Sequence, residues 1–157
     1  MSSRKNPHKT SFLIFAIFIV FFTASPLWSQ GEQRRDMDPV SFIGLDLTEL
    51  IRLFGIPRSV YAVRGLEIWQ DDVVFVYDQG DFYILKDRVW QVGIREALGV
   101  KIGDSRAVVL LVLGTRALYR GNSIFYSFDE GSWPLMIRFD FDNDHKVKVI
   151  FIYRTDI

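Results

Sequence analysis

The chain has 157 residues, of which 49% are hydrophobic and 15% aromatic, and it contains no cysteine. This length is enough for one compact domain or for two small fused ones. The absence of cysteine excludes disulfides, cysteine-ligated metals, thiol catalysis and lipid attachment through an N-terminal cysteine. The formal net charge is zero. After residue 30 the chain has 16 bases scattered among 19 acids, so no basic patch indicates nucleic-acid binding.

The N-terminus has the layout of a secretory signal peptide. A basic stretch in the first ten residues precedes an uninterrupted apolar run, Phe12–Phe22. This run of eleven residues is shorter than the roughly 20 that span a bilayer. We therefore predict that residues 1–30 are a cleaved signal peptide, that residues 31–37 are a linker, and that the mature protein is periplasmic or secreted. The alternative is an uncleaved anchor in the inner membrane.

Two similar segments are predicted to be short helices. In the first, Asp46 is a candidate N-cap, Glu49 completes the spacing of a capping box, and Gly55 ends the helix. In the second segment, 59 residues later, Ser105 takes the place of Asp46 and Gly114 takes that of Gly55. The correspondence indicates an internal repeat. An Asp-Pro pair at residues 38–39 adds one helical turn before the first helix.

After each helix the hydrophobic period changes to that of strands. The expected strands cover residues 59–63, 73–77, 82–85 and 89–92 after the first helix, and 123–128, 135–141 and 146–154 after the second. A helix followed by an antiparallel meander, twice, predicts an α+β fold of two tandem repeats. Each repeat is a short helix pair packed on an antiparallel meander sheet, and the repeats occupy residues 38–94 and 95–157.

The expected hairpins sort the strand residues onto two faces. A two-residue turn at residues 86–87 pairs Tyr83 with Trp90, and a three-residue turn at residues 143–145 pairs Asp140 with Lys148. In this register Val149 and Phe151 join the apolar face that the helix covers, and Val92 lies on the opposite face.

The opposite faces carry aromatic, methionine and arginine side chains, which are enriched at protein interfaces. We therefore predict one protein-binding surface. Its residues are Tyr83, Arg88, Trp90, Met136, Arg138, Asp140 and Lys148. The alternative is that the two repeats pack these residues against each other or under a loop.

The motifs around the helices resemble those of the BamE (SmpA/OmlA) and beta-lactamase-inhibitor-protein group. The resemblance rests on Gly44-Leu45-Asp46, Glu49, Phe54-Gly55-Ile56-Pro57 and Lys86-Asp87-Arg88-Val89, and in the second copy on Gly103, Ser105 and Leu113-Gly114. It implies helix-pair-on-sheet units in tandem and a non-catalytic envelope or exported protein that binds other proteins. The chain lacks the anchoring cysteine of BamE lipoproteins and the disulfides of the inhibitors, so neither specific role is carried over.

Residues suited to catalysis or metal binding are few. The only histidines are His8 and His145, so nucleophilic triads and zinc sites have nothing to build on. Acids alternate from Asp140 to Asp144, but a calcium loop needs glycine and glutamate where this chain has His145 and Phe151. We expect a non-enzymatic module without cofactor or metal, whose partner is another envelope or secreted protein. The alternatives are a small envelope enzyme using carboxylates in a cleft between the repeats, or a membrane-anchored structural protein.

Overall fold

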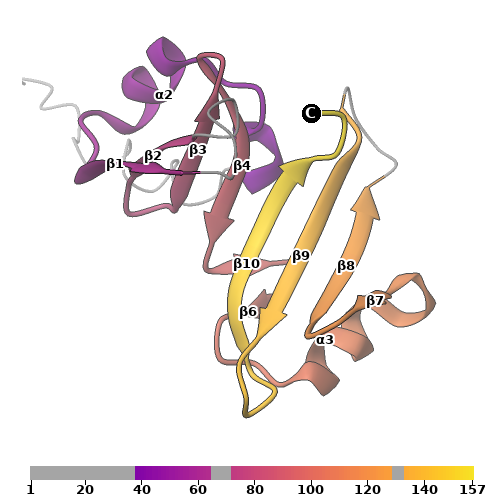
Figure 1. The fold of residues 1–157 in the computed structure, drawn as a ribbon. Coiled ribbons are helices and arrows are strands. Elements are labelled where there is room, and N and C mark those ends of the chain that lie inside the picture. The colour runs from indigo at the N-terminus through magenta and orange to yellow at the C-terminus, as the bar shows by residue number, and fades with distance from the viewer. Residues whose placement is uncertain (1–37, 65–71, 129–132) are drawn as a thin grey trace, which may run out of the picture.

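The computed structural model describes residues 38–64, 72–128 and 133–157, and most of its strands form one large sheet (Figure 1). Eight strands follow the order β1-β2-β3-β4-β10-β9-β8-β7, and all neighbours are antiparallel. They are β1 (Ser59–Val63), β2 (Asp72–Val76), β3 (Asp81–Leu85), β4 (Arg88–Ile94), β7 (Leu118–Arg120), β8 (Ser123–Phe128), β9 (Leu135–Phe141) and β10 (Val147–Arg154). Strands β5 (Glu96–Ala97) and β6 (Val100–Lys101) form a separate hairpin. The predicted signal peptide and linker, residues 1–30 and 31–37, lie outside the described residues.

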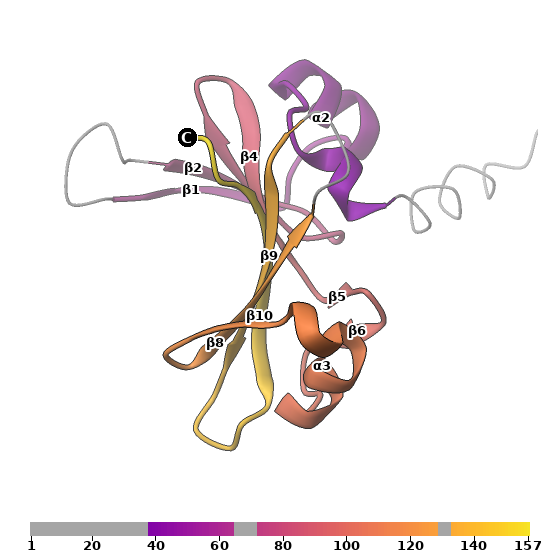
Figure 2. The ribbon, with the colours of Figure 1, turned by 90° about the vertical axis from the view of Figure 1, so that its right-hand side faces the viewer.

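Two α-helices lie on the same side of the sheet (Figure 2). They are α2 (Leu47–Phe54) and α3 (Arg106–Leu113), and two 3-10 helices accompany them, η1 (Pro39–Phe42) and η3 (Gly114–Arg116). Under α2, the rings of Phe42, Phe54, Tyr77 and Phe82 form a cluster with centroid separations of 5.3 to 5.6 Å. Under α3, Val109 and Leu113 join the buried residues of the sheet. The core therefore lies between the helices and one face of the sheet.

This architecture shows that the prediction of two tandem helix-pair repeats, each on its own meander, is wrong. Strand β4 pairs with β10, so strands from both halves of the chain belong to one sheet. Each half contributes one α-helix of eight residues and one 3-10 helix, not a pair of α-helices. A separate meander would leave free backbone groups along its edge strands. Joining two such edges satisfies these groups with hydrogen bonds.

The predicted start and end of the first helix are confirmed. The Asp46 carboxylate accepts a hydrogen bond from the Glu49 amide at 2.8 Å, and the Glu49 carboxylate accepts one from the Asp46 amide at 3.0 Å. Gly55 ends the helix with φ of 78°. The predicted turn before this helix is also observed, as η1, with the Asp38 side chain accepting from the Val40 amide at 3.0 Å. These local signals act within a few residues, so sequence alone reveals them.

Ser105 occupies the N-cap position of α3 as Asp46 does that of α2, so the predicted position is confirmed. The predicted capping role is wrong, because the Ser105 side chain makes no capping hydrogen bond. The carboxylate of the preceding residue, Asp104, instead accepts a hydrogen bond from the Lys101 amide at 2.7 Å. The Asp104 carboxylate therefore closes the turn before α3. The first turn of α3 has no side-chain cap at its N-cap residue.

A β-bulge in β4 makes the predicted pairing of Tyr83 with Trp90 wrong. Ile84 pairs with Val89 as predicted, but Tyr83 pairs with Gln91, so Trp90 is the extra residue. An extra residue moves every later side chain to the other face of the strand. Val92, predicted on the face opposite the helices, is therefore fully buried in the core.

A second bulge in β10 makes the predicted pairing of Asp140 with Lys148 wrong. Phe141 pairs with Val147, but Asp140 pairs with Val149, so Lys148 is the extra residue. Beyond the bulge, Ile150 and Ile152 enter the core in place of the predicted Val149 and Phe151. The two bulged strands, β4 and β10, are neighbours at the centre of the sheet.

Candidate protein-binding surface

In the part of the chain that the structure describes, no helix covers the side of the sheet opposite α2 and α3 (Figure 2). Cross-strand partners share a face, so the register identifies the residues on this side. One row contains Val74, Tyr83, Gln91, Tyr153 and Met136, and the next contains Asp81, Gly93, Phe151, Arg138 and Phe125. Together with Asp140 and Ser123, which pair with each other across β9 and β8, we call these residues the helix-free face.

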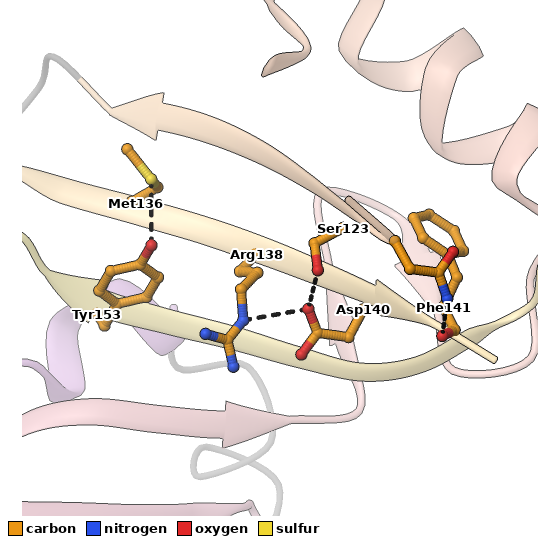
Figure 3. A network of polar contacts seen from close by, with 7 residues as sticks. Ser123, Met136, Arg138, Asp140, Phe141 and Tyr153 are labelled. Atoms are coloured by element: carbon orange, nitrogen blue, oxygen red, sulfur yellow. Dashed lines mark hydrogen bonds and ion pairs between the residues drawn. The ribbon is translucent and has the colours of Figure 1, made fainter. Parts of the chain in front are cut away.

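Five residues of the helix-free face form a continuous chain of contacts. The edge of one ring meets the face of the other between Tyr83 and Phe151, with centroids 5.9 Å apart. The Arg138 guanidinium lies over the Phe151 ring, with its Cζ 4.7 Å from the ring centroid. Arg138 Nε lies 3.2 Å from Asp140 Oδ1, and that oxygen also accepts a hydrogen bond from the Ser123 hydroxyl at 2.6 Å (Figure 3). The contacts link strands β3, β10, β9 and β8 across one face.

Arg138 is the charged centre of this arrangement. Its side chain is 33% exposed and that of Asp140 is 28% exposed. The ion pair uses Nε, and in Figure 3 the two terminal nitrogens point away from Asp140. A guanidinium carries five N–H donors, and its terminal nitrogens form the fork that binds a carboxylate through two parallel hydrogen bonds. The side chain is therefore held through Nε and the ring contact, while its terminal nitrogens point away from Asp140.

Two tyrosines flank Arg138 and keep their protons at neutral pH. Burial, with further contributions from Tyr61, Asp81 and Asp72, raises the pKa of Tyr83 to about 12 against the opposing effect of Arg138. Burial also raises the pKa of Tyr153, again against the opposing effect of Arg138. The Tyr153 hydroxyl lies 3.2 Å from Met136 Sδ and donates to it (Figure 3). Both phenols are therefore neutral hydroxyls on a half-buried aromatic surface.

Four of the seven predicted surface residues lie together on the helix-free face: Tyr83, Met136, Arg138 and Asp140. Phe151, Tyr153 and Ser123, which connect these four, were not predicted from the sequence. Phe151 and Tyr153 follow the Lys148 bulge, and nothing in the composition of β10 marks a bulge at that position. Counting alternate residues from the turn therefore assigned Phe151 to the wrong face.

The other three predicted residues take no part in this network. Arg88 Nη1 donates a hydrogen bond to the Gly44 carbonyl at 2.8 Å and so holds the turn before α2. The Trp90 indole N–H donates to Asp72 Oδ1 at 3.0 Å, which ties the bulge of β4 to the start of β2. Lys148 is exposed at the bulge of β10.

The described residues contain no group of three or more histidine, aspartate or glutamate side chains placed to hold a metal ion. His145 is an exposed residue of the β9–β10 turn with φ of 59°. None of the helices within residues 38–64, 72–128 and 133–157 is long and apolar enough to span a membrane.

No protein-family model and no curated protein sequence matches this chain. Among solved structures, it resembles an extracellular protein containing a SCP domain from Bacillus anthracis str. Ames, with a TM-score of 0.50 and 15% identity, over 76% of this chain and 46% of that one. It also resembles a cysteine-rich secretory protein from Staphylococcus aureus subsp. aureus Mu50, with a TM-score of 0.49 and 13% identity, over 78% of this chain and 48% of that one. The chain thus spans less than half the length of either protein, and at this identity the likeness concerns the fold alone.

The resemblance to BamE and the beta-lactamase inhibitor proteins is therefore corrected. The fold is shared instead with part of an SCP-domain protein, and the helix pairs that the resemblance implied are not present in the described residues. The residues that suggested it are an N-cap, a capping glutamate and a helix-ending glycine. Such residues recur wherever a short helix follows a tight turn, because they satisfy the free backbone groups of helix ends.

Proposed function

We propose that this protein is exported and acts, without catalysing a reaction, by binding another protein through its helix-free face. The observation that carries the proposal is the arrangement of Arg138, which is supported by the Phe151 ring and directs its terminal nitrogens away from Asp140 (Figure 3). Tyrosine and arginine are among the residue types that most often dominate interface energies. Half-buried Tyr83, Tyr153 and Met136 supply apolar area around the charge.

Export is supported by the N-terminal sequence. The basic stretch, the apolar run Phe12–Phe22 and the small residues after it are typical of a secretory signal peptide. One protein with a similar fold is described as extracellular. A binding role is favoured over catalysis because the chain has no cysteine and its only histidine after residue 30 lies in a turn. No feature of the helix-free face favours the two alternatives, which are an envelope enzyme and a membrane-anchored structural protein.

The helix-free face is tested by substitution of Arg138 in the exported protein. Secreted and envelope proteins of the native host are captured with the wild type, Arg138→Ala and Arg138→Lys as bait, and are quantified by mass spectrometry. Loss of a dominant interface residue costs 2 kcal/mol or more, so capture of the specific partner by Arg138→Ala should fall by about thirtyfold. Arg138→Lys keeps the charge but not the fork, so it should give an intermediate loss.

Arg52→Ala is the matched control, because Arg52 is an exposed arginine on α2, at the other side of the sheet. Its capture should equal that of the wild type. Equal capture by Arg138→Ala, in a protein with an unchanged melting temperature, would place the binding site elsewhere.

A further inference from the structure

The eight-stranded sheet ends in two strands, β1 and β7, and the described residues pair each of them on one side only. An edge strand presents unpaired backbone groups, and proteins protect such edges by charge, proline or a short strand. Strand β7 is protected in this way, because it has only three residues and ends in Arg120. Strand β1 has five residues, Ser-Val-Tyr-Ala-Val, with neither charge nor proline.

Strand β1 is also exposed along its whole length. The exposed fractions are 51% for Val60, 45% for Tyr61 and 38% for Val63. An uncharged, apolar edge whose outer side no described strand pairs is suited to the addition of another strand.

The sequence of β1 is complementary to itself. If two copies pair antiparallel about a twofold axis at Tyr61, each Tyr61 faces its equivalent, Val60 faces Ala62, and Ser59 faces Val63. An aromatic pair and two pairs of small or aliphatic residues are favourable across strands, and no like charges meet within the five positions.

The arginines that flank β1 already interact within their own chain. Arg58 forms an ion pair with Asp78, and Arg64 also has a partner in its own chain. The charge of Arg58 is therefore balanced locally, which lowers its repulsion toward the second copy.

We propose that a second copy of this chain pairs with β1 and forms a symmetric dimer with one sheet continuous across both molecules. Such an interface uses the same patch on both copies, as twofold symmetry requires. Tyr61 lies in the same cross-strand row as Val74 and Tyr83, so the pairing places the two helix-free faces edge to edge. Five residues per copy bury less than the roughly 1,200 Å² of a stable interface, so the dimer forms reversibly and depends on concentration.

The first test is sedimentation of the exported protein over a range of concentrations, with Tyr61→Lys and Tyr61→Glu as variants. The wild type should dimerise as its concentration rises. Like charges at the twofold axis, added to the loss of the aromatic pair, should weaken the dimer by about fivefold or more in each variant alone. An equimolar mixture of the two variants should recover dimer, because Lys then faces Glu.

The second test uses the absence of cysteine from the chain. Tyr61→Cys places a thiol at the twofold axis, where opposite Cβ atoms are close to the separation that a disulfide requires. Under mild oxidation this variant should form covalent dimers much faster than Tyr119→Cys. Tyr119 lies on the protected edge β7 and is 63% exposed, so it is the matched control.

Thermal melting establishes that each variant is folded, and Ala62→Lys provides a second charged variant, opposite Val60 in the dimer. The proposal is overturned if the wild type sediments as a monomer at every concentration. It is also overturned if mixing the Lys and Glu variants recovers no dimer, or if the Tyr119→Cys control cross-links as fast as Tyr61→Cys.

Discussion

The two halves of the chain attach a helix to the sheet through the same backbone joint. Before α2, Gly44 donates to the Val89 carbonyl at 2.8 Å, and the Val89 amide donates to the carbonyl of the next residue, Leu45, at 2.9 Å. Before α3, Gly103 and Val147 make the equivalent pair of hydrogen bonds, both of 2.8 Å, using the Asp104 carbonyl. The two glycines have φ of 90° and 93°, where other residues are strained.

The side chains around the two joints differ. Helix α2 has a capping box, packs Phe54 into an aromatic cluster, and directs polar residues such as Arg52 to solvent. Helix α3 has no side-chain cap, and it exposes Val108, Leu111 and Val112. The backbone joint therefore places each helix at the sheet, whereas the side chains decide how strongly each helix is held and what its outer surface offers.

The largest effect should come from the aromatic cluster. Phe54→Ala should cost about 3–5 kcal/mol of unfolding free energy, because Phe54 contacts Phe42, Tyr77 and Phe82. Leu113→Ala, at the equivalent end of α3, should cost about 2 kcal/mol, the lower end of the usual range, because leucine is smaller than phenylalanine and makes no ring contacts. Urea denaturation of both variants measures the difference. Equal losses would show that α3 is held as firmly as α2.

The next effect concerns the caps. Asp46→Ala should cost about 1 kcal/mol, because it removes the hydrogen bond to the Glu49 amide. Ser105→Ala should change stability by less than about 0.5 kcal/mol, because the Ser105 side chain caps nothing. Denaturant midpoints at constant m-value compare the two. A loss of about 1 kcal/mol in Ser105→Ala would mean that Ser105 caps α3 in solution.

The two halves also differ in the environment of their phenols. In the native state the pKa of Tyr83 is raised to about 12 from its ordinary value of 10.0. The protonated phenol therefore stabilises the folded state, and this stabilisation is complete below pH 10. It is lost as the pH rises from 10 toward about 12, because the unfolded chain ionises first. Tyr83→Phe should flatten this alkaline decline more than Tyr153→Phe does. Burial also raises the pKa of Tyr153, but Arg138 is the largest opposing influence there, whereas it is the smallest of the influences on Tyr83. Urea midpoints measured between about pH 9 and pH 11.5 give the slopes. Equal slopes in the wild type and Tyr83→Phe would show that ionisation of Tyr83 does not contribute to the alkaline loss of stability.

The smallest effect should come from the outer surface of α3. Leu111 is 85% exposed, so Leu111→Lys should leave the free energy of unfolding within about 0.5 kcal/mol of the wild type. Thr48→Lys is the matched control on the exposed surface of α2. A loss of more than about 1 kcal/mol in Leu111→Lys alone would show that the apolar side of α3 is covered in solution.

Sequence alone predicted the features that depend on neighbouring residues. The capping box at Asp46 and Glu49 and the glycine stops are local, because their hydrogen bonds span three or four positions. The two-residue turn at Lys86 and Asp87 also follows from local chemistry, and both residues have positive φ, of 49° and 63°. Strand positions followed from the hydrophobic period and agree with the structure to within about two residues. The hairpin β5–β6 and the short edge strand β7 were too brief to show a period.

Tertiary structure alone decided how the strands combine and which side chains meet. The pairing of β4 with β10 joins segments far apart in the sequence, and hydrophobic alternation does not say which strands are neighbours. The bulges at Trp90 and Lys148 reverse the alternation beyond them, because the helices bury Val92, Ile150 and Ile152 on one side of the sheet. Arg138 and Asp140 were predicted because they precede the turn on β9, which has no extra residue. Phe151 was missed because it lies beyond a bulge, and a single inserted residue changes the face of every side chain that follows it.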